Sequence, residues 1–152
     1  MALTSDELNK IHTLFSYLGI SADKIIVTDE PELITISVDV PEEEAGMYIG
    51  RFASTIDGIQ LLLSIMLNQG EVHRHLLLDI GGYRTRRTGT LQEMVDRVSQ
   101  EVAATGVARA LPPISSTERR QVHLMFQAHD TLTTYSQGEG QDRRLFIAPK
   151  NS

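Results

Sequence analysis

Apolar and polar positions along this chain follow two different periods, which predict both helices and strands. Near the amino terminus, residues 8–18 repeat apolar side chains at helical spacing, with Ser5 and Asp6 as candidate caps. Strict alternation over residues 34–40 has the period of a strand with one buried face. A short apolar run at residues 25–27 precedes it across an acidic turn. The pattern predicts a helix followed by an antiparallel pair of strands.

The middle of the chain continues with helical patterns and another strand. An acidic run at residues 42–44 follows Pro41, which favours the first turn of a short helix. Apolar residues recur at helical spacing over residues 56–66, and residues 73–82 have the composition of a strand. These elements predict a three-stranded sheet that helices cover on one face.

The second half of the chain predicts a further small α+β module. Residues 91–102 carry a helical apolar stripe, and Ser115 with Glu118 forms a capping box after two prolines. Residues 132–136 and 143–148 flank a glycine-rich turn, which is typical of a hairpin. We therefore expect two domains, residues 1–82 and residues 83–152.

The charge of the two halves differs more than the net charge of −6 suggests. Residues 1–82 hold four basic and thirteen acidic residues, a formal charge of −9, whereas residues 83–152 hold ten and seven, a formal charge of +3. Phosphates attract basic surfaces, so only the second half has the electrostatics expected of a nucleic-acid partner.

Composition argues against several other classes of protein. The chain has no cysteine, which excludes disulfides and thiolate sites. Its longest apolar stretch, residues 59–67, is far shorter than the roughly 20 residues of a membrane span, so we expect a cytoplasmic protein without membrane insertion. His73 and His75, with Glu71 nearby, suggest a metal site, but a third and a fourth ligand are not evident, and the alternative is a pair of histidines on a solvated sheet face. We expect no catalytic residue, metal or cofactor.

A short stretch between the two central helices, Gly50-Arg51-Phe52-Ala53, has the composition of a loop that approaches a ligand. Glycine lets the backbone come close, and the amides that open the next helix present donors to a phosphate. A plain turn between helices is the alternative, because short glycine motifs often match by chance.

The sequence around this loop, GMYIGRFASTIDGIQLL, resembles the KH segment of the bacterial Jag (KhpB) family, G-x-L-I-G-x-x-G-x-T-L-x-A-L-Q. The matching residues are Gly46, Ile49, Gly50, Thr55 and Gln60. The resemblance implies a type II KH domain, an RNA-binding module whose loop clamps about four nucleotides. Ala53 departs from the pattern, because the family has its second loop glycine there and alanine disfavours positive φ.

A second motif, SSTERRQVHLMF, carries Arg119 and His123 four residues apart. This spacing places both side chains on one helical face, where they can contact successive phosphates, or a phosphate and a base. The alternative is an ordinary solvated helix face. Because the motif follows a D-I-x-G-Y-R-x-R-R link at residues 79–87, it is similar to the R-three-H domain of the same family, a small binder of single-stranded nucleic acid.

Basic residues at the junction of the two halves supply further candidates. Arginines with Tyr83 nearby can grip phosphates and stack a base; their alternative role is to balance acidic helix faces through ion pairs. The nucleic-acid-binding residues expected from the two motifs and the junction are Arg119, His123, Arg120, Arg84, Arg86, Arg87, Tyr83, Gly50, Arg51, Phe52 and Ala53.

The family resemblance implies a non-enzymatic protein that binds single-stranded RNA, or single-stranded DNA, which the R-three-H signature also tolerates. It implies post-transcriptional regulation connected to cell-envelope growth or division, and a small KH-domain protein or a second copy of the chain as partner. The amino-terminal Jag domain that many relatives carry is expected to be missing. The alternative is that the KH half serves protein interaction or dimerisation, with nucleic-acid binding confined to the R-three-H half.

Overall fold

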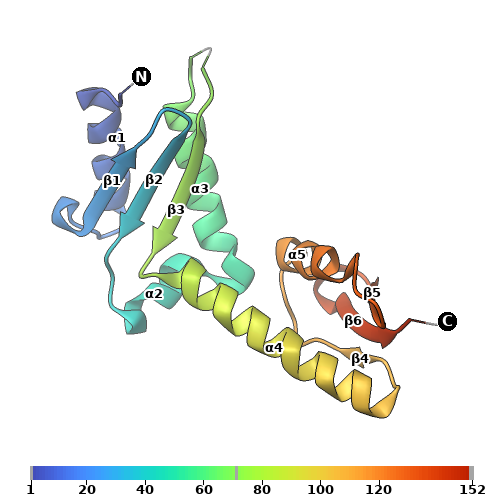
Figure 1. Ribbon diagram of the computed structural model, residues 1–152. Coiled ribbons are helices and arrows are strands. Elements are labelled where there is room, and N and C mark those ends of the chain that lie inside the picture. The colour runs from blue at the N-terminus through green and yellow to red at the C-terminus, as the bar shows by residue number, and fades with distance from the viewer. Residues whose placement is uncertain (1, 71, 151–152) are drawn as a thin grey trace. The chain divides into compact units, whose positions relative to one another are not determined.

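The computed structural model describes residues 2–70 and 72–150 and divides the chain into two compact units, Met1–Thr85 and Arg86–Ser152. Both units are α+β (Figure 1). The first contains α1 (Ser5–Tyr17), β1 (Ile25–Asp29), β2 (Leu33–Val38), α2 (Glu42–Ile49), α3 (Ser54–Leu67) and β3 (His75–Ile80). Helix α4 (Tyr83–Thr105) begins in the first unit, and β4 (Arg109–Ala110), α5 (Ser116–Phe126), β5 (Leu132–Gln137) and β6 (Arg144–Pro149) follow in the second. Short 3-10 turns lie at Ala22–Lys24, Arg51–Ala53 and Gly140–Asp142.

The sheet of the first unit has the order β1-β2-β3, with β1 antiparallel and β3 parallel to the central strand. Alternation along β2 buries Ile34, Ile36 and Val38, which pack against buried residues of α1, α2 and α3, including Phe15 and Leu63. Figure 1 shows α1 and α3 on the same side of the three strands. The predicted three-stranded sheet, covered by helices on one face, is confirmed.

The amino-terminal cap of α1 lies one residue earlier than predicted. Thr4, and not Ser5 or Asp6, is the N-cap, and its hydroxyl accepts a hydrogen bond from the backbone N–H of Glu7 at 3.2 Å. The Glu7 carboxylate accepts the Thr4 backbone N–H at 2.7 Å. Together they form a capping box, in which two donors of the first turn are satisfied reciprocally.

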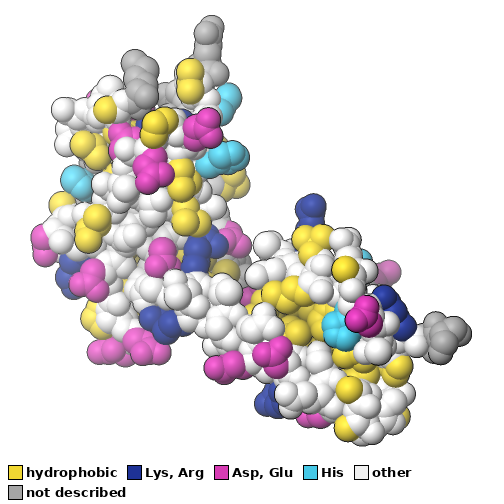
Figure 2. All heavy atoms as spheres, viewed as in Figure 1, with side chains coloured by type: hydrophobic (Ala, Val, Ile, Leu, Met, Phe, Trp, Pro, Cys, Tyr) yellow, Lys and Arg dark blue, Asp and Glu magenta, His cyan; other side chains and the backbone are white. Residues whose placement is uncertain are grey.

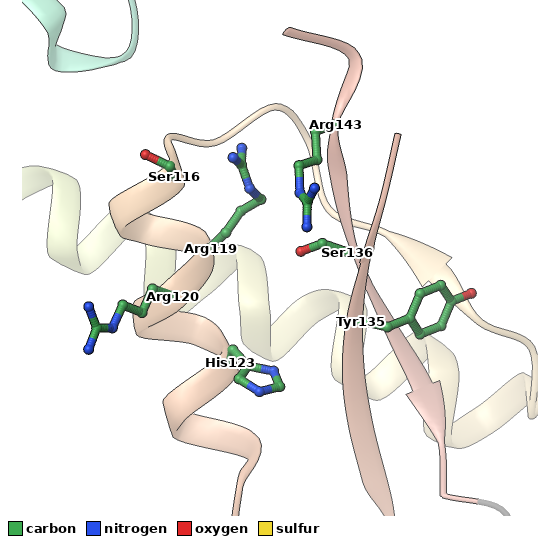
Figure 3. Close-up of a pocket in the computed structure, with 7 residues that line it drawn as sticks. All are labelled: Ser116, Arg119, Arg120, His123, Tyr135, Ser136 and Arg143. Atoms are coloured by element: carbon green, nitrogen blue, oxygen red, sulfur yellow. The ribbon is translucent and has the colours of Figure 1, made fainter. Parts of the chain in front are cut away.

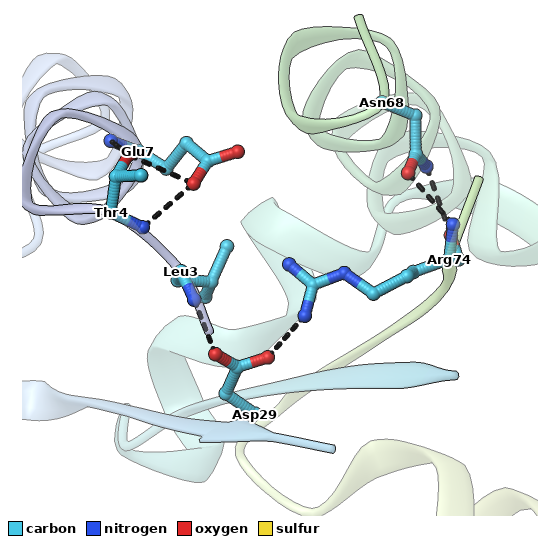
Figure 4. Close-up of polar contacts among 6 residues, drawn as sticks. All are labelled: Leu3, Thr4, Glu7, Asp29, Asn68 and Arg74. Atoms are coloured by element: carbon cyan, nitrogen blue, oxygen red, sulfur yellow. Dashed lines mark hydrogen bonds and ion pairs between the residues drawn. The ribbon is translucent and has the colours of Figure 1, made fainter. Parts of the chain in front are cut away.

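A polar cluster ties the amino terminus to two strands of the first unit (Figure 4). The carboxylate of Asp29 at the end of β1 accepts the backbone N–H of Leu3 and forms an ion pair with Arg74, which precedes β3. The backbone hydrogen bond from Leu3 and the guanidinium of Arg74 together hold the pKa of Asp29 below its usual value. Asn68 bonds both backbone groups of Arg74 at 2.9 Å. These contacts join residues that lie far apart in the sequence.

The second unit packs α4 and α5 against one face of an antiparallel sheet with the order β4-β6-β5. Its core combines Leu91 and Val98 of α4, Val122 of α5, and Leu145 and Ile147 of β6. The hairpin and the capped helix occur as predicted, whereas the two-residue strand β4 is too short to leave a period in the sequence. Within the described residues, no helix is long and apolar enough to cross a membrane.

Candidate functional site

The loop between α2 and α3 depends on a left-handed backbone. Gly50 has φ +73°, and a Cβ at this position would lie 2.2 Å from the Thr55 hydroxyl oxygen and 2.9 Å from the Thr55 backbone nitrogen. Phe52 and Ala53 also have positive φ, 53° and 61°. Ala53 therefore adopts the left-handed conformation that glycine favours, at a cost of about 1 kcal/mol or more.

The chemistry that this loop presents is modest. The guanidinium of Arg51 lies 5.1 Å from the centroid of the Phe52 ring, in cation–π geometry, and the Arg51 side chain is exposed. The loop follows α2, whose first turn carries the three carboxylates of residues 42–44. Acidic side chains are spread over the visible face of the first unit (Figure 2). The loop thus presents one exposed cation, Arg51, in a unit that has a large excess of carboxylates.

Arg84, predicted as a nucleic-acid contact, makes several contacts within the first unit. Its Nε donates to the Leu78 carbonyl at 2.7 Å, and its Nη2 donates to Gln60 Oε1 at 2.8 Å. The Asp57 carboxylate lies 3.6 Å from the same Nη2. Its backbone N–H donates to Asp79 at 3.1 Å. These bonds attach the first turn of α4 to α3 and β3, which gives the junction arginine and the matching glutamine of the loop motif a structural role.

The other junction residues lie in different surroundings. Arg87 forms a bidentate ion pair with Glu118 of α5, at 2.5 and 3.1 Å, inside the second unit. Burial raises the pKa of Glu118, but hydrogen bonds from Arg87 and Ser115 outweigh it and hold that pKa below its usual value. Tyr83 packs, half-buried, against the core of the first unit, and Arg86 is exposed on α4. Two of the junction arginines, Arg84 and Arg87, thus already donate to acceptors of the protein.

Helix α5 supports a strongly cationic pocket. Its N-cap, Ser115, and Glu118 form the predicted capping box, which defines where the helix begins. One turn further on, Arg119, Arg120 and His123 line a pocket against β5, so the structure brings the predicted signature pair together (Figure 3). The remaining lining residues are Ser116, Tyr135, Ser136 and Arg143.

Side-chain hydrogen bonds orient the signature pair. His123 Nδ1 lies 2.8 Å from the hydroxyl of Thr134, a polar residue of β5 that is buried. Because this bond holds the imidazole through Nδ1, Nε2 is the ring atom that remains for a ligand. Arg119 Nη1 donates to the Ile114 carbonyl at 2.9 Å, which holds the guanidinium near the start of the helix. Two side chains of the pocket are thus positioned before any ligand arrives.

Arg143 was not among the predicted contact residues, yet it completes the pocket from the opposite side. It lies just before β6, and Figure 3 shows its side chain directed toward Ser136, across from Arg119. Arg120 points away from the strands, and the ring of Tyr135 points away from His123. The only sequence signal for Arg143 was its place in the basic pair beside the hairpin turn, because a hairpin alone does not say which helix packs against it.

The pocket has the chemistry of an anion site. Its seven lining residues contribute three guanidinium groups and an imidazole but no carboxylate. Within the described residues, no carboxylate lies at ion-pair distance from Arg119, Arg120 or Arg143. Guanidinium groups present donors in a planar fork that matches phosphate oxygens. Such a pocket can bind a phosphate without the cost of breaking an internal ion pair.

The alternative of a metal site does not gain support. Of the three residues that suggested it, Glu71 lies outside the described residues, and His73 precedes β3 and is not part of the strand. In residues 2–70 and 72–150 there is no group of three or more His, Cys, Asp or Glu side chains that could hold a metal ion.

Comparisons with known proteins agree with this arrangement. Residues 89–149, most of the second unit, match the R-three-H domain family. The chain is 32% identical over 132 residues to RNA-binding protein KhpB of Lactiplantibacillus plantarum, and 30% identical over 133 residues to that of Bacillus subtilis. KhpB of Clostridium symbiosum is 27% identical over 141 residues. These alignments cover 86, 85 and 92% of this chain.

The chain spans 40, 64 and 63% of the length of these three relatives. The alignments nevertheless run through both units, and the R-three-H match includes α5 with its Arg119 and His123. The chain is therefore related to the KhpB proteins over both units, and its second unit carries an R-three-H domain.

Proposed function

We propose that the chain binds single-stranded nucleic acid, and RNA in particular, through the cationic pocket of Arg119, Arg120, His123 and Arg143. The observation that carries the proposal is the pocket itself, in which three guanidinium groups and an oriented imidazole meet without a carboxylate. Phosphates supply most of the affinity in such complexes. The relatives are named RNA-binding proteins, which favours RNA over DNA as the ligand.

The division of the molecule supports the same assignment. Arg86–Ser152 has nine basic and seven acidic residues, whereas Met1–Thr85 has five and thirteen, so their formal charges are +2 and −8. The second unit attracts phosphates and the first repels them. We place the junction residues Tyr83, Arg84, Arg86 and Arg87 second to the pocket, because the guanidinium groups of Arg84 and Arg87 already have protein acceptors.

We further propose that the first unit is a type II KH domain. The order helix, strand, strand, helix, loop, helix, strand supports this, as does the parallel pairing of β2 with β3. In this proposal Gly50, Arg51, Phe52 and Ala53 form the clamp loop. The proposed domains, residues 1–82 and 83–152, differ by three residues from the division between the two compact units. The family resemblance supports a role in post-transcriptional regulation connected to cell-envelope growth or division.

A salt titration of the full chain with a short single-stranded RNA tests the proposal. Contact with about three phosphates gives a log–log slope of binding against salt near roughly −2 on a single strand. We expect the double variant Arg119→Ala/His123→Ala to weaken binding about tenfold or more, and Arg51→Ala to weaken it less. A slope near zero, or a larger effect at Arg51, would contradict the assignment to the pocket.

Exposed apolar residues on the first unit favour a second function, protein interaction or dimerisation. Helix α3 exposes Leu61, Leu62 and Ile65 on adjacent positions, each more than half exposed, and Ala53 replaces the loop glycine. A protein-interaction or dimerisation surface accounts for both features. Substituting Ala53→Gly separates the two roles: a severalfold gain in RNA affinity shows that the loop faces RNA, and an unchanged affinity supports the interaction role. Light scattering of the free chain measures self-association.

A further inference from the structure

The sheet of the second unit has one covered and one open face. Along β5, Leu132 and Thr134 are buried under the helices, whereas Tyr135, the residue after Thr134, is 44% exposed. The register places Tyr135 opposite Phe146 of β6, on the face that α4 and α5 do not cover. Tyr135 thus presents an aromatic ring on a face of the sheet that the helices leave open.

The two aromatic rings form a flat pair. Their centroids are 5.1 Å apart and their planes differ by 2°. Phe146 is half-buried and supports the more exposed Tyr135 from one side. A nucleobase has a π-face whatever its identity, so a parallel aromatic pair can extend its stack by one base without reading the sequence.

The aromatic pair and the cationic pocket share one strand edge. β5 is one of the two edge strands of the sheet, and adjacent residues of a strand point to opposite faces. Tyr135 contributes to the rim of the pocket while its ring points away from His123, and its neighbour Ser136 lines the pocket itself (Figure 3). Only the thickness of one strand separates the two surfaces at this edge.

Positive charge also continues onto the open face. Arg144 lies two residues before Phe146 on β6, so both side chains leave the same side of the sheet. Its Nη1 donates to the Gln141 carbonyl at 2.7 Å, which holds the guanidinium in place while it keeps its full charge. A nucleic-acid strand that leaves Arg143 therefore meets another cation as it crosses the edge of β5.

We propose that Tyr135, supported by Phe146, is a stacking platform for one unpaired base of the strand whose phosphates occupy the cationic pocket. The strand passes over the edge of β5, with a phosphate near Arg143 on one face and the following base on Tyr135 on the other. This inference rests on the proposed function and adds a stacking contact with one base to the phosphate contacts of the pocket. It predicts preference for flexible, unstacked strands over duplexes, because a paired base is not available to stack.

The full chain and two substitutions at the same position test the platform. Tyr135→Leu keeps an apolar side chain but removes the ring, and we expect it to weaken binding of a short single-stranded RNA about tenfold. Tyr135→Phe keeps the ring and is expected to bind within about twofold of the unchanged chain. Thermal unfolding of both variants checks that the hairpin remains folded.

An RNA of the same length without bases separates stacking from a general effect on the pocket. On this ligand we expect Tyr135→Leu and the unchanged chain to bind equally, because no base remains to stack. An equal loss on both ligands, or no loss on the normal RNA while Arg119→Ala/His123→Ala still weakens binding, overturns the platform and leaves the proposed function intact. If the unchanged chain binds neither ligand, the proposed function fails together with the platform.

Discussion

The two units support their candidate contact residues in different ways. In the first, the loop Gly50 to Ala53 relies on backbone conformation: three of its four residues have positive φ, and two of these are not glycine. In the second, the pocket relies on side chains that a capped helix and a hairpin hold in place, with His123 bonded to Thr134 and Arg119 to a carbonyl. The loop carries strain, whereas the pocket is assembled from ordinary conformations.

The difference shows why the number of arginines alone does not locate a binding surface. Arg84 and Arg87 lie close together in the sequence, but their guanidinium groups contact acceptors of the protein. Arg119 and Arg143 are 24 positions apart, yet they line the same pocket. Arg119 donates to one backbone carbonyl, whereas Arg84 bonds both Leu78 and Gln60 and Arg87 pairs with a carboxylate. A ligand has fewer and weaker partners to compete with at Arg119.

Substitution of the loop glycine should have the largest effect on stability. Gly50→Ala places a methyl group 2.2 Å from the Thr55 hydroxyl oxygen in a left-handed backbone, so we expect the first unit to lose about 2–4 kcal/mol of stability. Gly58→Ala is the matched control: its Cβ meets nothing within 4 Å in α3, and we expect a gain of about 0.5–1 kcal/mol. Hydrogen exchange of the β2 amides measures the stability of the first unit in both variants. Similar values for the two variants would contradict the role of the Gly50 backbone.

A pair of arginine substitutions tests whether Arg84, at the junction, and Arg143, in the pocket, have different roles. Arg84→Gln removes bonds to Leu78 and Gln60, and we expect the first unit to lose about 1–3 kcal/mol of stability with little change in the salt slope. Arg143→Gln should leave stability unchanged, weaken RNA binding roughly fourfold at physiological salt, and reduce the slope by about 0.7. Urea unfolding measures the stability of each variant, and a salt titration measures its RNA binding and the salt slope. The comparison fails if Arg84→Gln changes the slope more than Arg143→Gln does.

The smallest predicted effect is on the pH dependence of the stability of the second unit, through Glu118 in the first turn of α5. The pKa of Glu118 is lowered in the folded chain, so its contribution to stability is present above its usual value of 4.5 and is lost as pH falls through the folded pKa. We expect Glu118→Gln to lower the stability of the second unit at pH 7 by about 1 kcal/mol and to flatten its decrease with acid. Thermal unfolding at several pH values measures this. Parallel curves for the two proteins would show that the Arg87 pair contributes nothing.

Much of the fold could be predicted from local patterns. The alternation of β2, the capping box of Ser115 and Glu118 and the glycine-rich hairpin turn each record an interaction within a few residues, and all three occur in the structure. The cap of α1 was misplaced by one residue, because threonine, serine and aspartate are adjacent there and all three can cap. Strand β4 was missed because two residues are too few to show a period.

The candidate site could be predicted only in part. The R-x-x-x-H spacing placed Arg119 and His123 on one face of α5, since helical geometry alone requires this. Arg143 stood out in the sequence only as one of two adjacent arginines near the last strand, and not as a contact residue. The bond from His123 to Thr134 and the contacts of Arg84 were not identified at all, because they join elements whose packing is not encoded in a short window.

The sequence by itself determined the order of the elements, the uneven distribution of charge and the two motifs, because these depend on spacing and composition. The tertiary structure decided which arginines pair with a carboxylate and which line a pocket, and that Ala53 takes a left-handed conformation. It also decided that the ring of Tyr135 points away from His123, whereas its neighbour Ser136 lines the pocket. The physical reason is that hydrogen bonds and ring contacts form between side chains that only the packing of strands and helices brings within reach.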